Sequence, residues 1–283
     1  GCGIRGIEKT AKGFTFHTKG GDFYATKCIM ATGGKTLKKS GSDGSGFLYL
    51  ESLGHHIIDL VPGLIGLKGK QSFFADIAGI RADVKVDLYI ESTHVCSEQG
   101  ELQLTNYGIS GIPVFQLSRV AARALSEQKK VYATLNFVPL WEKEQCLTYF
   151  KERFKKADEK RIGEALIGFF PEKLIPVLLE ESHIKAAKYA NRLQTEELER
   201  FIDTVQGLRV DITDWNTFDT AQVTAGGVDT DEIDAETMES KLCPGLYFAG
   251  EMVDIDGICG GYNLQCAWSS GAVAGIHVAR ELS

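Results

Sequence analysis

The sequence has no apolar stretch of the roughly 18 residues that a membrane-spanning helix needs. It also has no long run of lysine and arginine, and its formal net charge is −7. A nucleic-acid-binding surface needs clustered basic residues, so we expect neither a membrane protein nor a nucleic-acid-binding one. No signal peptide is apparent at the start of the chain, which favours a cytoplasmic protein.

The cysteines never occur as Cys-x-x-Cys, and their number is odd. They are Cys2, Cys28, Cys96, Cys146, Cys243, Cys259 and Cys266. Zinc sites and disulfide frameworks need closely spaced or paired cysteines. We therefore expect reduced thiols, with no metal site and no disulfide framework.

The composition is that of a globular chain. Of its 283 residues, 43% are hydrophobic and 24% are charged. This length is enough for two or three compact units, each with its own core.

The clearest functional pattern lies near the end of the chain. Residues 245–251 (GLYFAGE) predict a short buried strand that ends in a Gly-Glu pair. Residues 260–271 (GGYNLQCAWSSG) begin with two glycines and lead into a small-residue helix that we expect to reach Arg280. Such glycines let a ligand approach the backbone, and a helix N-terminus offers unpaired N–H groups and partial positive charge. An ordinary strand–loop–helix has the same pattern, so the residues alone leave both interpretations open.

The first six residues (GCGIRG) match the G-x-G-x-x-G dinucleotide motif literally. We reject the match because no strand precedes it and the residues that follow do not predict a helix. Residues 14–18 and 23–26 instead predict a hairpin with a glycine turn. Residues 27–34 (KCIMATGG) predict a parallel strand buried on both faces, which presents two glycines to a ligand at its carboxyl end. A short helix follows at 47–53.

The middle of the chain changes character twice. Residues 56–139 contain short β-rich segments with one helix that begins near Gly111, and β-segments return at 208–228. These segments predict a small antiparallel barrel or sandwich. Residues 141–206 have helical apolar spacing, with lysines and glutamates that we interpret as a solvated surface. Gly226 and Gly227 permit close approach of either a ligand or another strand.

Several motifs together resemble one flavoprotein family. They are IMATGG (29–34), GISGIPVFQLS (108–118), TAGGVDT (224–230), TMESK (237–241), GLYFAGE (245–251), DIDG (254–257) and GGYNLQCAWSSG (260–271). The chain resembles the NAD(FAD)-utilising dehydrogenases, of the aminoacetone oxidase and 3-dehydro-bile-acid reductase type. The similarity spans essentially the whole chain.

This resemblance implies an α/β fold, in which a Rossmann-like FAD domain is split by an inserted β-barrel and a small helical bundle. We expect residues 1–55 and 235–283 in the FAD domain. The barrel then takes 56–139 and 207–234, and the helical domain takes 140–206.

The resemblance also implies the cofactor-binding residues. Thr32, Gly33 and Gly34 would lie near the adenine-ribose or pyrophosphate, Gly250 and Glu251 near the ribityl chain or pyrophosphate, and Gly260, Gly261, Tyr262, Asn263 and Leu264 at the flavin ring. We expect Tyr262 and Asn263 to act mainly through their backbone. No general acid or base is assigned, and we interpret Cys259 as a packing residue.

One departure from the family concerns the start of the chain. Family members begin with a strand, a true G-x-G-x-x-G turn and a helix. In those proteins, these elements come before the position that corresponds to residue 1 of this chain. We therefore expect a C-terminal fragment that binds FAD poorly and is inactive alone. We also expect the flank of strand 27–32 to be an apolar edge that invites a homodimer.

The leading functional hypothesis is an FAD-dependent oxidoreductase. The flavin would transfer hydride or electrons between NAD(P)H or a small amine or enone substrate and an acceptor. The alternatives are a non-catalytic protein-binding module and an FAD-dependent tRNA-modifying enzyme, and the acidic charge disfavours the latter.

Overall fold

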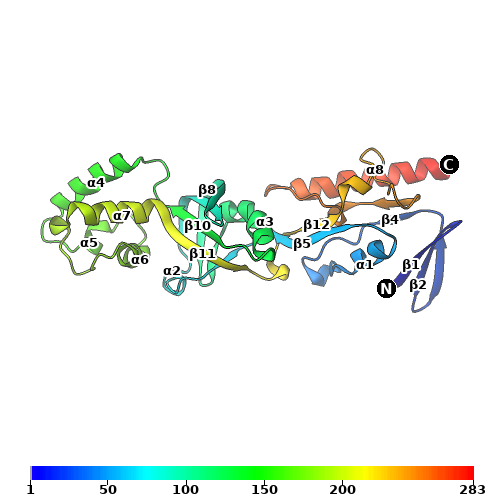
Figure 1. Ribbon diagram of the computed structural model, residues 1–283, viewed down its shortest axis with the longest axis horizontal. Helices are drawn as coiled ribbons and strands as arrows, with labels where there is room; N and C mark the ends of the chain where they lie inside the picture. Colours follow the sequence, from blue (N-terminus) through cyan, green and yellow to red (C-terminus); the bar gives the residue numbers. More distant parts are fainter. Residues whose placement is uncertain (1) are drawn as a thin grey trace. The chain divides into compact units, whose positions relative to one another are not determined.

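The computed structural model describes residues 2–283, which divide into two compact units (Figure 1). Unit 1 consists of Gly1–Leu64 and Thr217–Ser283, and unit 2 consists of Ile65–Asn216. Unit 2 is thus one continuous insertion within unit 1. The sequence predicted the two crossing points near residues 56 and 235. In the structure the chain passes between the units at residues 64–65 and 216–217, because strands 57–63 and 223–228 pair with each other and both belong to unit 1.

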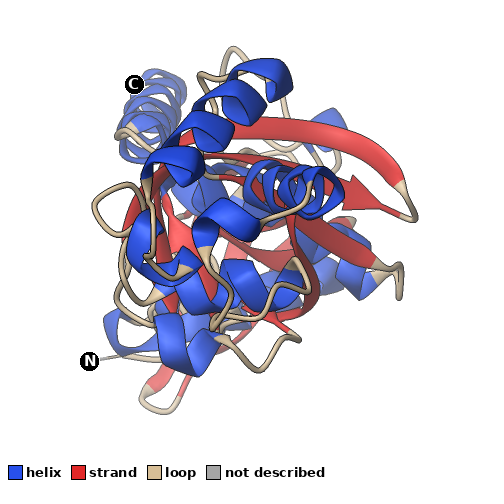
Figure 2. Ribbon diagram, turned by 90° about the vertical axis from the view of Figure 1, so that its left-hand side faces the viewer, coloured by secondary structure: helices blue, strands red, loops and turns tan. Residues whose placement is uncertain are grey.

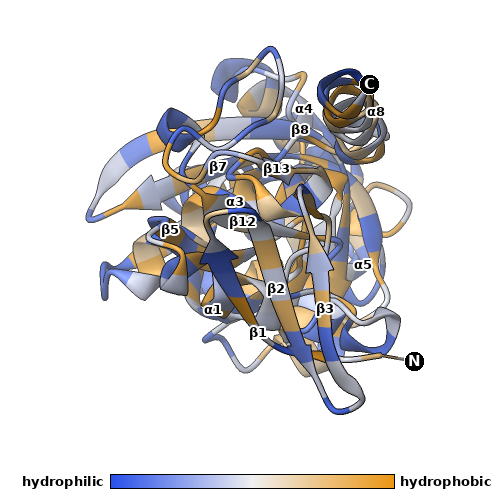
Figure 3. Ribbon diagram, turned by 90° about the vertical axis from the view of Figure 1, so that its right-hand side faces the viewer, coloured by the Kyte–Doolittle hydropathy of each residue, from blue (hydrophilic) through white to orange (hydrophobic). Residues whose placement is uncertain are grey.

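Unit 1 begins with a three-stranded antiparallel sheet. Its strands are β1 (Ile4–Thr10), β2 (Gly13–Thr18) and β3 (Gly21–Ala25), in the order β1-β2-β3 (Figure 3). This sheet confirms the predicted hairpin. Gly6 lies inside β1, so this part of the rejected dinucleotide motif is a strand, while Gly1 lies outside the described residues.

A parallel pair of strands contains parts of the motifs at residues 27–34 and 245–251. Strand β4 (Cys28–Met30) pairs in parallel with β13 (Leu246–Phe248), as the sequence predicted for this fold class. The prediction that β4 is buried on both faces is wrong, because Ile29 is 40% exposed. Side chains alternate along a strand, and only Cys28 and Met30 point into the core.

Two helices and a second pair of strands complete unit 1. Helix α1 spans Ser45–Ser52, helix α8 spans Tyr262–Leu282, and β5 (Ile57–Gly63) pairs antiparallel with β12 (Val223–Val228). A Cβ on Gly226 would lie 2.4 Å from the carbonyl oxygen of Asp59, and one on Gly227 would lie 2.6 Å from that of Met252. These two glycines therefore serve the approach of other chain segments rather than of a ligand.

Unit 2 contains a closed antiparallel barrel, which confirms one of the two predicted β architectures. Its strand order is β10-β11-β6-β9-β8-β7. The strands are β6 (Leu67–Gly69), β7 (Arg81–Ile90), β8 (Thr93–Thr105), β9 (Gly108–Gly111), β10 (Val131–Asn136) and β11 (Leu208–Trp215). Helix α3 (Ile112–Ser126) begins directly after Gly111, with Pro113 in its first turn as predicted. A short helix, α2 (Phe74–Ile77), precedes β7.

The helical part of unit 2 gathers at one end of the barrel, at the front of Figure 2. Its helices are α4 (Lys143–Lys156), α5 (Ile162–Leu166), α6 (Leu174–Glu181) and α7 (Thr195–Gly207). Barrel and helices share one hydrophobic core, in which Leu135 of the barrel and Val205 and Phe201 of α7 are fully buried. The two predicted insertions therefore form one compact unit.

Short 3-10 helices connect these elements. They are η1 (Lys38–Ser40), η2 (Ala190–Arg192), η3 (Phe218–Thr220), η4 (Thr230–Glu232) and η5 (Gly250–Met252). Across residues 2–283, no helix combines the length and the apolar character needed to cross a membrane.

Candidate functional site

Helix α8 begins at an open position in unit 1. Its N-cap residue, Gly261, has φ +91°, and a Cβ placed there would meet nothing within 4 Å. The first backbone hydrogen bond of the helix runs from the Gln265 N–H to the Gly261 carbonyl. The N–H groups of residues 262–264 precede this bond, so they are free of the helical ladder, at the positive end of the helix dipole.

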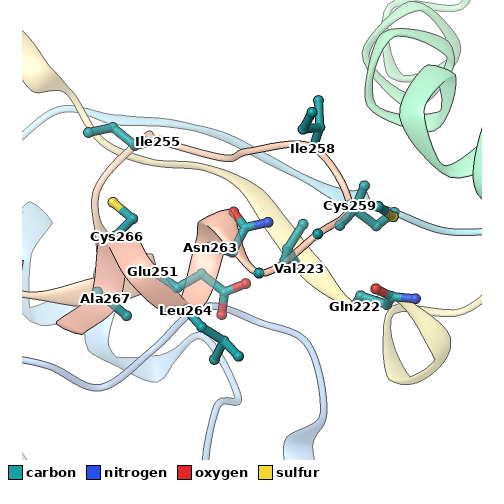
Figure 4. Close-up of a pocket in the computed structure, with 14 residues that line it drawn as sticks. Gln222, Val223, Glu251, Ile255, Ile258, Cys259, Asn263, Leu264, Cys266 and Ala267 are labelled. Atoms are coloured by element: carbon teal, nitrogen blue, oxygen red, sulfur yellow. The ribbon is translucent and has the colours of Figure 1, made fainter. Parts of the chain in front are cut away.

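A cavity of about 420 Å³ lies at this helix start. It is lined by Leu64, Gln222, Val223, Gly250, Glu251, Ile255, Ile258, Cys259, Gly260, Gly261, Asn263, Leu264, Cys266 and Ala267 (Figure 4). Most of these side chains are apolar. No lysine or arginine lines the cavity, and Glu251 is its one charged lining residue.

Six of the ten predicted cofactor-binding residues meet in this cavity. They are Gly250, Glu251, Gly260, Gly261, Asn263 and Leu264. Gly250 and Glu251 belong to η5, which follows β13, and the other four residues lie at the start of α8 or directly before it. Tyr262 does not line the cavity, and it is 59% exposed.

The Glu251 carboxylate binds backbone groups of its own chain. One oxygen accepts the N–H of Thr224 at 2.6 Å, and the other accepts the N–H of Gly34 at 3.1 Å. Burial raises the pKa of Glu251, although these two hydrogen bonds act in the opposite direction. Glu251 thus joins the segment after β4 to β12 at the edge of the cavity.

The predicted residues 32–34 do not line the cavity. The Thr32 hydroxyl donates to the Met252 sulfur at 3.2 Å. A Cβ on Gly34 would lie 2.3 Å from the Thr224 hydroxyl oxygen. Internal packing therefore accounts for a glycine at position 34, and the cofactor contacts of residues 32–34 stay a prediction.

The Asn263 side chain binds the backbone of Gly257, and the expected backbone role of Asn263 toward a cofactor stays a prediction. Its amide oxygen accepts the Gly257 N–H at 2.8 Å, and its amide nitrogen donates to the Gly257 carbonyl at 3.0 Å. The Asp254 carboxylate accepts the Gly226 N–H at 3.0 Å. The loop 254–260, which forms one wall of the cavity, is thereby fixed at two points.

Sequence reasoning missed the residues that close the cavity. These are Leu64, Gln222, Val223, Ile255, Ile258, Cys266 and Ala267. In Figure 4, Gln222 and Cys259 lie at the end away from Cys266 and Ala267. A signal existed only for Ala267, which is a small residue one helical turn after Asn263.

Gln222 and Cys259 line the cavity with an amide and a thiol, respectively. The Gln222 side chain forms no hydrogen bond to residues 2–283, so its amide is free to donate or accept. Burial raises the pKa of the Cys259 thiol, so this thiol is neutral at pH 7. The packing role expected for Cys259 stays a prediction.

The cavity fits a planar, uncharged ring system such as the flavin ring that the sequence resemblance implies. Its volume lies in the range of small-molecule sites, its walls are largely apolar, and backbone N–H groups border it. Without a lining cation, it is poorly suited to a diphosphate. The ring, rather than the phosphates, is therefore the part of FAD that fits here.

Comparison with known proteins adds two findings. Residues 2–277 match the family model of the HI0933-like protein Rossmann domain. A 3-dehydro-bile acid delta(4,6)-reductase from Clostridium scindens is 43% identical over 275 residues, which cover 97% of this chain and 67% of that protein.

More distant relatives carry a different name. Ribosomal RNA dihydrouridine synthases from Escherichia coli and Haemophilus influenzae are each 28% identical, over 94% and 89% of this chain and over 64% and 60% of their own. The chain thus spans about two thirds of the length of the curated relatives that it matches.

Proposed function

Because this chain belongs to the HI0933-like Rossmann-domain family, we propose that it acts as an FAD-dependent oxidoreductase whose flavin ring binds at the start of α8. The main support is the helix start itself, where unpaired N–H groups border an apolar cavity. Bound FAD would supply hydride-transfer chemistry. The N–H groups of residues 262–264 favour negative charge on a bound ring, and the Asn263 clamp holds one cavity wall in place.

We infer that the substrate contains a carbon–carbon double bond conjugated to a ketone, within an apolar molecule. The support is the relative that is 43% identical, which is named a 3-dehydro-bile acid delta(4,6)-reductase. Saturation of one such bond adds a hydride and a proton, and NAD(P)H, becoming NAD(P)⁺, would supply the hydride equivalent. The free Gln222 amide is suited to donate a hydrogen bond to the ketone oxygen.

A second candidate is modification of RNA, because two relatives at 28% identity are named ribosomal RNA dihydrouridine synthases. The net charge of −7 and the absence of a cation among the cavity residues disfavour it. A protein-binding module without catalysis is the remaining alternative.

Filling the cavity tests the flavin site. We expect Ala267→Leu to weaken flavin binding at least about tenfold, because the larger side chain occupies the space that the ring needs. The measurement is a titration of FAD followed by flavin fluorescence. Ala272→Leu is the matched control, since Ala272 is exposed on the same helix. Equal flavin affinity of both variants and the parent chain would exclude this cavity as the flavin site.

An activity assay tests the reaction class separately. NAD(P)H oxidation with added FAD should depend on a 3-oxo bile acid that has double bonds at C4 and C6. If flavin binds at this cavity but only uridine-containing RNA is reduced, the RNA-modifying alternative replaces the proposal.

The finer expectations about the chain stay predictions. The matches give no support to the expectation that it is an inactive C-terminal fragment with weak FAD binding. NAD(P)H as reductant, a homodimer through the edge near β4 and a cytoplasmic location also stay predictions.

A further inference from the structure

We propose that the helical part of unit 2 contains a second binding site, for a carboxylate with an apolar body. The site is a cavity of about 440 Å³ between α4, η2 with the segment after it, and the first turns of α7. These helices are at the front of Figure 2. The cavity shares no residue with the one at the start of α8, so this site stands independently of the proposed flavin site.

The floor of the cavity is apolar. Leu147 and Phe154 of α4 and Leu198 of α7 line it, and Phe154 and Leu198 are 3% and 6% exposed. A water-filled cavity over such side chains is less favourable than one filled by hydrocarbon. The floor therefore fits the apolar body of a ligand.

The four lysines of α4 differ in a way that points to a ligand. Lys143 and Lys156 are in ion pairs with neighbouring acids. Lys151 and Lys155 line the cavity and make no ion pair or hydrogen bond with residues 2–283. They are one helical turn apart, so both ammonium groups are available to the same anion. The lysines that line the cavity are thus the two without a protein partner.

The rest of the rim adds neutral polar groups. The Asn191 and Thr195 side chains line the cavity and form no hydrogen bond within residues 2–283. Glu199 is the one acid among the lining residues, so the two lysines give the rim a net positive charge.

An amphipathic carboxylate can contact both the lysines and the apolar floor of the cavity. Its head would bind Lys151 and Lys155, and its body would cover the apolar floor. A nucleic-acid backbone would use only the cations and would leave the floor empty, and the chain carries a net charge of −7. The carboxylate is therefore the ligand class that this cavity favours.

Calorimetric titration of the whole chain with dodecanoate, below its micellar concentration, tests the site. We expect one-to-one binding that weakens at least about tenfold in the double variant Lys151→Gln/Lys155→Gln, because both charge contacts are lost. Lys156→Gln is the matched control on the same helix and should bind like the parent chain. Dodecanol should bind more weakly than dodecanoate, because it lacks the charge.

Any one of four outcomes would overturn the proposal, and the first three concern dodecanoate and dodecanol. They are no binding of dodecanoate by the parent chain, an equal loss in Lys156→Gln, and equal affinity for dodecanol. A fourth is that a short uridine-rich RNA binds and loses affinity in the double variant while dodecanoate does not bind. Circular dichroism of the variants checks the fold, which we expect to be unchanged because all three lysines are exposed.

Discussion

Glu251 shows how one side chain serves both the fold and the candidate site. Its two oxygens bind the backbone N–H groups of Thr224 and Gly34, which lie far apart in the sequence. The same carboxylate lines the cavity at the start of α8. A substitution at this position therefore changes cavity shape and native-state stability together, so affinity measurements need a stability control.

We expect Glu251→Gln to lower the free energy of unfolding by about 1–3 kcal/mol, because an amide has one acceptor oxygen and leaves one of the two buried N–H groups unpaired. Urea unfolding measures the change. Glu236→Gln, at an exposed position of the same unit, should change it little.

The pH dependence gives a second readout for the same variant. Since burial raises the pKa of Glu251 in the native state, its ionisation lowers stability as the pH rises above the ordinary carboxyl range. Glu251→Gln should remove this decline. A loss of stability in the variant that is no larger than in Glu236→Gln would contradict the role of the two hydrogen bonds.

At the scale of elements, helix starts determine the local chemistry. Helix α8 begins at a glycine whose open side leaves its first N–H groups available to a ligand. Helix α7 instead caps itself, because Glu197 accepts the Gln194 N–H at 2.8 Å and also binds the Lys188 ammonium at 2.5 Å. The first arrangement suits binding and the second suits stability.

Lys188 lowers the pKa of Glu197, assisted by the Gln194 N–H. A carboxyl with a lowered native pKa stabilises the fold above its ordinary pKa, and this contribution disappears as the pH falls through the native value. We expect Glu197→Gln to cost about 0.5–1 kcal/mol at pH 7, and the difference from the parent chain to vanish on acidification towards pH 3. Urea unfolding across this range is the measurement, with Glu196→Gln as the control. A difference that persists at low pH would show that charge is not responsible.

At the scale of the whole molecule, two hydrophobic cores correspond to the two units. One core contains the barrel and helices of unit 2, and the other contains β4, β13 and α1 of unit 1. No buried residue is shared between these two clusters. Each unit therefore has its own source of apolar stabilisation.

Separate cores predict separate responses to core mutations. Phe201→Ala should destabilise unit 2 by about 3–5 kcal/mol, because Phe201 is fully buried there. Amide hydrogen exchange resolved by segment should accelerate in α7 and the barrel but not in β2, β4 or β13. Phe248→Ala should give the reverse pattern, and uniform acceleration in either variant would contradict two independently stabilised units.

The sequence by itself determined the fold class, the family resemblance and most of the elements. Helical periodicity predicted α4 to α7, and glycine stops predicted β4, β13 and the start of α8. Within the β-rich range 56–139, β8 has no strand pattern of its own in its first half, which is largely exposed and lacks the alternation of a half-buried strand. The family match confirms the Rossmann-like α/β class that these patterns and the resemblance implied.

Only the tertiary structure decided how the site is closed. No local pattern reveals that Glu251 binds the backbone of two distant segments, that Gly34 packs against Thr224, or that Asn263 clamps the loop at Gly257. Gln222 and Val223 reach the cavity through β12 and the turn before it, from a part of the sequence without a recognisable motif. Local patterns reflect interactions between neighbours in the chain, whereas a cavity is formed by residues that meet only after the long-range packing is complete.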